Sequence, residues 1–161
     1  MTEKMNILLG SNSPRRNELL AQLGFDFTKV SITCDEEFSP DMVVGKVPEY
    51  LAIKKSMAYK ALHDSDVLIT ADTVVIAEGI ILNKPADRAE AIHMLSTLSG
   101  KEHSVQTGVC IRSVYKQESF TTETVVKLRK ISQEDIAHYV DTYKPYDKAG
   151  AYGIQEWFGL A

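Results

Sequence analysis

The stretch LLGSNSPRRNELL, residues 8–20, decides the fold class, because it joins a short apolar run to an amphipathic segment through a polar turn. The run at 6–10 predicts a buried strand. Pro14 suits the first position of a helix that we expect to continue to about Leu23 and stop at Gly24. A strand that leads directly into a helix is typical of α/β proteins.

Two arginines, Arg15 and Arg16, occupy the first turn of this helix, where the helix dipole already presents partial positive charge. One interpretation is a phosphate site, with N–H groups of the turn around Ser11 and Ser13 and one arginine gripping the anion. The other is a capped helix with two solvated arginines. The spacing GxxxxGK[ST] is absent, so the stretch is not a P-loop.

The rest of the chain continues the alternation of strands and helices and then forms a hairpin. Strands are expected at 25–32, 67–77, 80–82, 102–113 and 119–128, and helices at 48–63, from 85–87 to Gly100, and at 132–142. The segment 143–161 reads as irregular, and no linker or repeat interrupts the chain. We therefore expect one domain, residues 1–161, of α/β class.

Composition excludes several classes of partner. The chain has 161 residues, 44% of them apolar, and a net charge of −4, which gives no global attraction to nucleic acid or to anionic lipid. No apolar run approaches the roughly 20 residues that span a bilayer, and the N-terminus does not read as a signal peptide. Cys34 and Cys110 are too few for a zinc site or a disulfide framework. We expect a cytoplasmic protein with neither nucleic acid nor membrane as a partner.

Asp72 stands in the middle of the strongly β-prone run VLITADTVVIA, residues 67–77. A carboxylate buried in a strand without a partner would be costly, so Asp72 is a candidate base or metal ligand. The alternative is that the strand simply ends and turns there. If the strand continues, Thr73 points to the opposite face of the sheet.

Other charged residues form a second set of candidates. The acidic run Asp35–Glu37 could hold a hard cation, or it could be a solvated loop. On a helical wheel Lys54 falls between two apolar stripes and Lys55 at their edge, and the wheel does not say which lysine reaches inward. Lys84, just before a helix, is a further candidate anion contact.

The segment DKAGAYGIQEW, residues 147–157, combines charges, glycines and Gln155. Its glycines allow a ligand to approach the backbone closely, and the glutamine amide could read a base edge, since it both donates and accepts. An ordinary glycine-rich loop fits the composition equally well.

Four blocks together resemble the Maf family: SNSPRRNELL (11–20), ADTVV (71–75), NKPADRAEAIHMLSTLSGKEHSVQTGV (83–109) and YDKAGAYGIQ (146–155). The resemblance implies a nucleoside triphosphate pyrophosphatase that cleaves between the α- and β-phosphates. It also implies a divalent metal, Mg²⁺ or Mn²⁺, and a homodimer. The implied fold is an elongated, two-lobed mixed sheet flanked by helices, similar to the inosine triphosphatase fold, with the active site in the cleft between the lobes.

The family's residue roles carry over position by position. Asp72 matches the catalytic proton acceptor, and Arg15, Thr73 and Gln155 match the specificity positions of the subgroup that acts on dTTP and UTP. The phosphate would be held by Ser11, Ser13, Arg16, Lys55 and Lys84; the metal by Glu37 and Asp72; and Asp147 and Lys148 match further cleft residues.

The resemblance also has a gap. Family members usually continue for some tens of residues beyond YGIQ, whereas this sequence ends at Ala161. The alternative function is therefore a nucleotide-binding or cell-division regulatory module with little turnover. A pyrophosphatase that removes modified pyrimidine nucleotides, a housecleaning role, is a second alternative.

Overall fold

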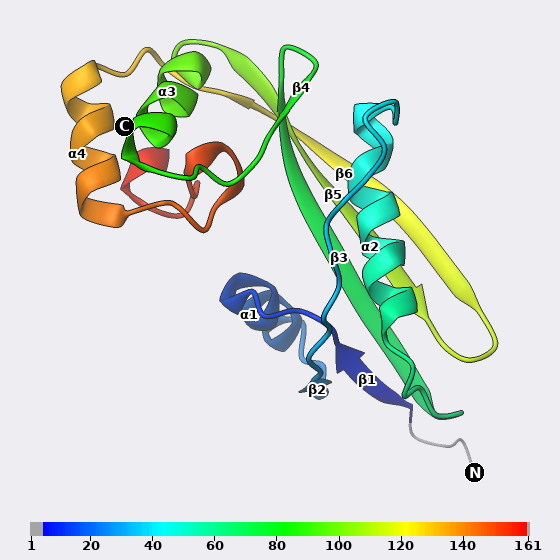
Figure 1. Ribbon diagram of the computed structural model, residues 1–161. Coiled ribbons are helices and arrows are strands. Elements are labelled where there is room, and N and C mark those ends of the chain that lie inside the picture. The colour runs from blue at the N-terminus through cyan, green and yellow to red at the C-terminus, as the bar shows by residue number, and fades with distance from the viewer. Residues whose placement is uncertain (1–4, 161) are drawn as a thin grey trace. The chain divides into compact units, whose positions relative to one another are not determined.

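The computed structural model describes residues 5–160, and its elements alternate as the sequence predicts (Figure 1). The strands are β1 (Asn6–Leu9), β2 (Phe27–Lys29), β3 (Asp66–Ala77), β4 (Ile80–Leu82), β5 (Glu102–Arg112) and β6 (Gln117–Lys127). The α-helices are α1 (Pro14–Gln22), α2 (Val47–Ala58), α3 (Arg88–Leu98) and α4 (Gln133–Tyr143). Short 3₁₀ turns lie at Val44–Lys46, Ala149–Ala151 and Trp157–Gly159. No helix in this described part of the chain is long and apolar enough to cross a membrane.

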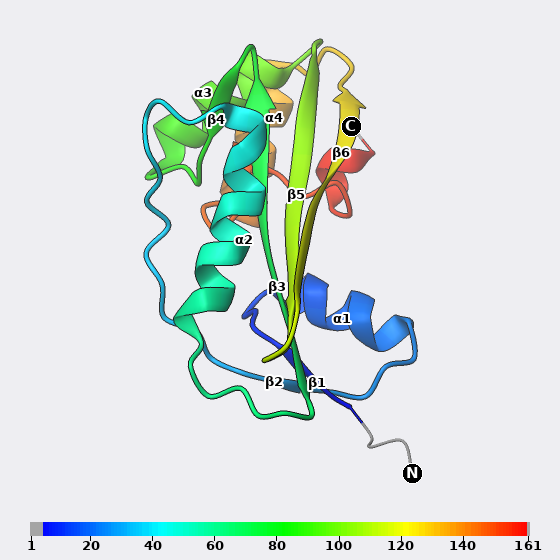
Figure 2. The ribbon, with the colours of Figure 1, turned by 90° about the vertical axis from the view of Figure 1, so that its right-hand side faces the viewer.

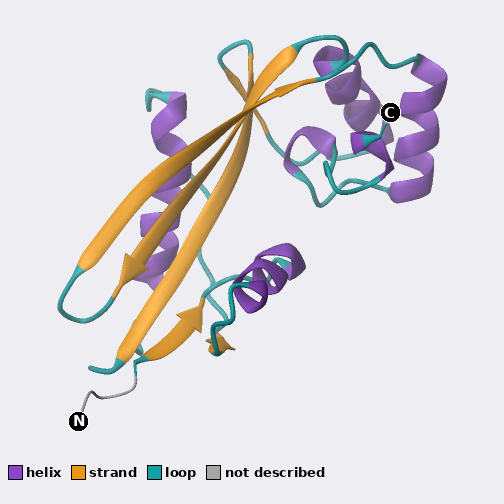
Figure 3. Ribbon diagram, turned by 180° about the vertical axis from the view of Figure 1, so that it is seen from behind, coloured by secondary structure: helices purple, strands orange, loops and turns teal. Residues whose placement is uncertain are grey.

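The strands form one mixed sheet in the order β2-β1-β3-β5-β6, with β4 paired to β3. β1 runs parallel to both neighbours, so that Ile7 lies opposite Phe27 and Val67, whereas β4 runs antiparallel to β3. β5 and β6 form the predicted hairpin (Figure 3). The Ser113 N–H donates to the Lys116 carbonyl across its turn (2.8 Å). The α/β fold class is confirmed; the elongated outline and the cleft between lobes stay predictions.

The chain divides into two compact units, each described by itself. Unit 1 consists of the described residues up to Asp72 together with Thr107–Thr122, and unit 2 of Thr73–Gln106 together with the described residues from Glu123 onward. By their residue ranges β3, β5 and β6 contribute to both units.

Unit 1 is organised by α2, which lies along the sheet strands in Figure 2, while α1 lies on the other side of β3 from it in Figure 1. Pro48 stands in its first turn, and Val47, Leu51 and Ala52 are buried on its inner side. The helix α2 approaches β5 closely, because a Cβ added to Gly108 on β5 would lie 2.2 Å from the Pro48 carbonyl. Only glycine leaves room for the helix to rest on the strand at this point.

The α2 helix is shorter than its sequence pattern predicts, because it ends at Ala58 and not near 63. The reason is a tertiary contact. Arg112 donates from its guanidinium to the carbonyls of Ser56 (2.5 Å) and Tyr59 (2.8 Å) and to the Ser56 hydroxyl (2.9 Å). These bonds occupy carbonyls that a further helical turn would have used.

Unit 2 holds a continuous apolar core beneath α3, α4 and the C-terminal segment, which lie side by side in Figures 1 and 3. Both helices begin where their sequences predict, with side-chain caps from Asp87 to the Glu90 N–H (2.8 Å) and from Ser132 to the Asp135 N–H (3.1 Å). The core is built from Ala77, Ala91, Met94, Leu95, Leu98, Leu128, Ile131, Ile136, Tyr139, Val140, Ala151, Tyr152 and Phe158.

Candidate active site

Asp72 lies inside β3, which continues to Ala77, so the alternative of a strand ending at this acid is wrong. Its side chain is only 11% exposed, and its Oδ1 lies 2.5 Å from the Lys55 Nζ. Burial raises the pKa of Asp72 above its usual value, and the Glu36 charge adds to the rise, while Lys55 and Arg16 oppose it. The result is a buried carboxyl group whose proton affinity is increased.

Lys55 is the inward-reaching lysine that the helical wheel could not identify. Its side chain is 16% exposed, and its Nζ lies between Asp72 and the Glu36 Oε1, which is 3.0 Å away. Burial alone would lower the pKa of Lys55, but its bonds to the two carboxylates outweigh burial and raise it. The ammonium group is therefore charged at neutral pH.

Arg16 brings a second cation to the same end of unit 1. It lies on α1 and donates from its NH1 to the carbonyl of Ala71, the residue before Asp72 (2.8 Å). Burial lowers the pKa of Arg16, whereas the charges of Asp72 and Glu36 raise it. Arg15, by contrast, is exposed, and it pairs with Glu18 one turn along α1 (3.6 Å).

The serines of the opening stretch cap the turn. The Ser11 hydroxyl accepts from the Ser13 N–H (3.2 Å), and the Ser13 hydroxyl accepts from the Arg16 N–H (3.5 Å). The capped-helix interpretation is thus correct for these two N–H groups. Phosphate binding by either serine stays a prediction, and it would require the hydroxyl groups or other N–H groups of the turn.

The acidic loop contributes Glu36, which sequence reasoning missed. The predicted metal ligand was Glu37, whose N–H donates to the Asp35 carboxylate (3.0 Å) and whose carbonyl accepts from Lys54 (2.9 Å). Glu36 is the acid that contacts Lys55. An irregular loop has no periodicity, so nothing in the sequence could tell which of two adjacent acids turns toward α2.

The remaining predicted site residues belong to unit 2. Thr73 follows Asp72 and is partly exposed, as expected for the opposite face of a strand. Lys84 and Gln155 are exposed, and Lys148 pairs with Asp147 (3.2 Å). Their roles stay predictions.

The oxygen donors of unit 1 suit a hard divalent cation. Two carboxylates, from Asp72 and Glu36, converge on one ammonium group, and Mg²⁺ commonly uses one or two carboxylates together with substrate phosphates. Within residues 5–160 no group of three or more acidic, histidine or cysteine side chains could hold a metal by itself. The residues therefore fit a cation that is shared with a phosphate ligand.

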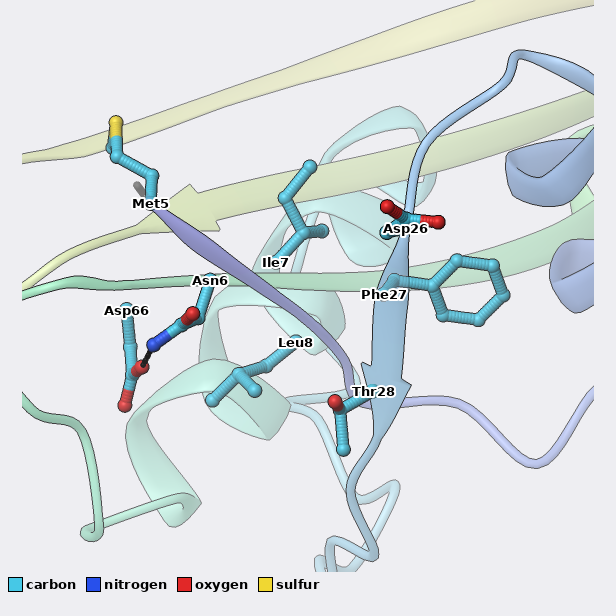
Figure 4. Close-up of a pocket in the computed structure, with 8 residues that line it drawn as sticks. All are labelled: Met5, Asn6, Ile7, Leu8, Asp26, Phe27, Thr28 and Asp66. Atoms are coloured by element: carbon cyan, nitrogen blue, oxygen red, sulfur yellow. Dashed lines mark hydrogen bonds between the residues drawn. The ribbon is translucent and has the colours of Figure 1, made fainter. Parts of the chain in front are cut away.

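A pocket in unit 1 involves none of these residues (Figure 4). It lies at the start of the parallel strands, where Asn6 donates to the Asp66 carboxylate (3.2 Å). Asp66 also accepts from the His63 N–H (3.0 Å), so its carboxylate serves to fix the entry into β3. The lining residues are Met5, Asn6, Ile7, Leu8, Asp26, Phe27, Thr28 and Asp66.

Comparisons with known proteins concern the family of the chain. The profile of a family described as "Maf-like protein" matches residues 6–161. A protein of Bacteroides thetaiotaomicron named dTTP/UTP pyrophosphatase is 45% identical over 159 residues, covering 98% of this chain and 82% of its own. Proteins of the same name from Porphyromonas gingivalis and Christiangramia forsetii are 48% and 40% identical, covering 98% and 96% of this chain and 81% and 79% of their own.

Among solved structures, the Ham1 protein of Staphylococcus aureus is similar with a TM-score of 0.54 and 16% identity, covering 76% of this chain and 71% of its own. This likeness concerns the fold alone. It agrees with the mixed sheet and flanking helices described above.

Proposed function

The chain belongs to the family of Maf-like proteins, and we propose on this basis that it hydrolyses dTTP and UTP to the nucleoside monophosphate and pyrophosphate. The names of relatives that are 40–48% identical support this choice of substrate. The observation that carries the proposal is the buried Asp72 carboxyl group, held by Lys55 beside Arg16.

In the proposed reaction Asp72 orients a water molecule and accepts its proton as the water oxygen attacks the α-phosphorus. The bond from that phosphorus to the bridging oxygen breaks, and the electron pair leaves with pyrophosphate. The raised pKa of Asp72 improves it as a base compared with an exposed aspartate. Lys55 and Arg16 offset the charge that gathers on the leaving phosphates.

A divalent cation, Mg²⁺ or Mn²⁺, is part of the proposal, and when bound it would neutralise phosphate charge and polarise the reacting phosphoryl group. Asp72 and Glu37 were predicted to hold it. The contact between Glu36 and Lys55 makes Glu36 an equally suitable ligand beside Asp72. Lys55 would then give up part of its contact with these carboxylates when metal and substrate enter together.

Substrate choice is assigned to three residues that match the family's specificity positions. We propose that Arg15, Thr73 and Gln155 select the thymine or uracil nucleotide. Ser11, Ser13 and Lys84 are proposed to contact phosphate, with Asp147 and Lys148 as neighbouring polar groups. The exposure of Arg15, Lys84 and Gln155 supports these roles, because each side chain is accessible to a ligand.

We further propose that residues 1–161 form one functional domain, which acts in the cytoplasm on free nucleotides and assembles as a homodimer. Size-exclusion chromatography with light scattering checks the dimer. A measured mass equal to that of a single chain, at a micromolar protein concentration, would overturn the proposed homodimer and no other part of the proposal.

A nucleotide panel tests the proposed activity. Pyrophosphate release is measured with dTTP, UTP, CTP, ATP and GTP in Mg²⁺ and in Mn²⁺. The expected result is turnover of dTTP and UTP above the other three. Binding of dTTP by calorimetry without pyrophosphate release would instead support the regulatory module.

A further inference from the structure

In the segment after α4, the carboxylate of Glu156 joins two other side chains and has no role in the reaction proposed above. Glu156 accepts the hydroxyl hydrogen of Tyr139 on its Oε2 (2.6 Å) and pairs with the Lys148 ammonium through its Oε1 (3.2 Å). Each carboxylate oxygen thus holds a different partner. Glu156 also directly follows Gln155, and Lys148 lies at the other end of the same segment.

Tyr139 anchors this set of contacts between Tyr139, Glu156 and Lys148. It is fully buried on α4, and its ring packs against Phe158 (4.9 Å between ring centroids) and Trp157 (6.1 Å). Besides donating to Glu156, its hydroxyl accepts from the Gly153 N–H (3.2 Å). Burial and the neighbouring Glu156 raise the pKa of Tyr139, so the hydroxyl stays protonated and can donate at any physiological pH.

The backbone within the segment is held in unusual conformations. Gly150 and Ala151 have φ angles of 69° and 64°, a region that an alanine rarely adopts. Gly153 packs so tightly that a Cβ there would lie 3.2 Å from Lys148 Cε and 3.4 Å from Glu156 Cδ. Backbone strain of this kind persists only where surrounding contacts over-determine it. The Gly150 N–H donates to the Asn83 carbonyl (3.3 Å) and the Ala151 N–H to the carbonyl of Lys148 (3.1 Å), the residue whose side chain pairs with Glu156.

We propose that Glu156, anchored by Tyr139, is a positioning residue that sets the place of Lys148 and of Gln155 for substrate selection. This inference rests on the proposed function, since Gln155 is assigned there to base recognition. Glu156 itself touches neither base nor phosphate in the proposal. It acts by keeping the 147–156 segment in one conformation before the nucleotide arrives.

The test compares Glu156→Gln and Tyr139→Phe with the wild type in steady-state kinetics on dTTP, UTP and CTP. Glu156→Gln removes the charge but keeps an acceptor, and Tyr139→Phe removes only the hydroxyl and keeps the ring in the core. Each is expected to raise the KM for dTTP by about tenfold, the effect of one charge-assisted hydrogen bond, with a smaller change in kcat. The preference for dTTP over CTP is expected to shrink in both variants.

Glu134→Gln is the matched control, because Glu134 is an exposed acid in the first turn of α4 in the same unit. It loses the same charge and should leave KM and base preference unchanged. A drop in Tm for Glu156→Gln and Tyr139→Phe with an unchanged KM and unchanged base preference would reduce Glu156 to a structural residue and overturn the proposal.

A double-mutant cycle with Lys148→Met tests the coupling. If Glu156 acts by positioning Lys148, the effects of Glu156→Gln and Lys148→Met on kcat/KM are less than additive. Full additivity contradicts that part of the inference.

Hydrogen exchange of the 147–156 amides separates this inference from the proposed function. Exchange is expected to be faster in Glu156→Gln and Tyr139→Phe and unchanged in Glu134→Gln, whether or not the enzyme turns over. If the wild-type protein hydrolyses no nucleotide, the proposed function fails while the positioning of the segment is still measured. Unchanged exchange in both network variants overturns the positioning itself.

Discussion

Two adjacent lysines on α2 show how burial separates a site residue from a surface one. Lys54 pairs with the exposed Asp35, whereas Lys55 pairs with the buried Asp72. Exposed ion pairs contribute little to stability, and burying two charges carries a desolvation cost that their attraction only partly offsets. The Lys55–Asp72 pair is therefore better explained by the chemistry of Asp72 than by the stability of the fold.

The pH dependence of activity tests these electrostatic interactions with two substitutions that should shift the pKa of Asp72 in opposite directions. The positive charge of Lys55 lowers the pKa of Asp72, and the negative charge of Glu36 raises it. In Lys55→Met the acidic limb of kcat/KM is therefore expected to move to higher pH, and in Glu36→Gln to lower pH, because that limb reports the ionisation of the base in the free enzyme.

Lys54→Met is the control for both variants, since Lys54 is not among the groups that shift the pKa of Asp72. Its acidic limb should match the wild type. A shift of the limb in the same direction in Lys55→Met and Glu36→Gln would contradict Asp72 as the titrating base.

At the scale of elements, the starts of the helices were predicted well, and so were the ends of α1, α3 and α4, whereas the end of α2 was not. Asp87 and Ser132 cap α3 and α4 through local side-chain bonds, which a sequence displays directly. The end of α2 depends on Arg112, which is more than fifty residues away along the chain. The local pattern of apolar residues does not show a hydrogen-bond donor that is distant in sequence, so the sequence predicted a longer α2 helix.

The packing of α2 on β5 leads to a stability prediction. Gly108→Ala places a Cβ 2.2–2.3 Å from backbone atoms of Pro48 and Glu49, and backbone cannot move aside as a flexible side chain does. We expect a loss of about 1–3 kcal/mol in the free energy of unfolding, measured by urea denaturation, as for other overpacked sites.

Gly79→Ala is the comparison for this variant. Gly79 has a φ of 76° and no atom within 4 Å of the added Cβ, so it tests conformational strain without a steric clash. An unchanged free energy of unfolding in Gly108→Ala would show that the contact between Gly108 and α2 is not tight in solution.

For the whole molecule, the sequence predicted the fold class, the hairpin and the family, and the structure and the comparisons confirm these. Asp72 and Arg16 stand in the motif blocks, because residue type and spacing are local properties that a sequence displays. The partnership of Glu36 with Lys55, and that of Tyr139 with Glu156, join segments distant in sequence. Such contacts depend on tertiary packing, which composition and periodicity do not encode residue by residue.

The most direct test of the account is product analysis of dTTP hydrolysis by the wild type and by Asp72→Asn, with both products followed by anion-exchange chromatography. Asp72→Asn should fold normally, because the raised pKa of Asp72 means that ionising this carboxyl group at pH 7 costs the folded state stability, which the neutral amide avoids. We expect equal amounts of dTMP and pyrophosphate from the wild type and a loss of about 10²- to 10⁴-fold in kcat for the folded variant. Release of dTDP and phosphate, or near-normal turnover by Asp72→Asn, would contradict it.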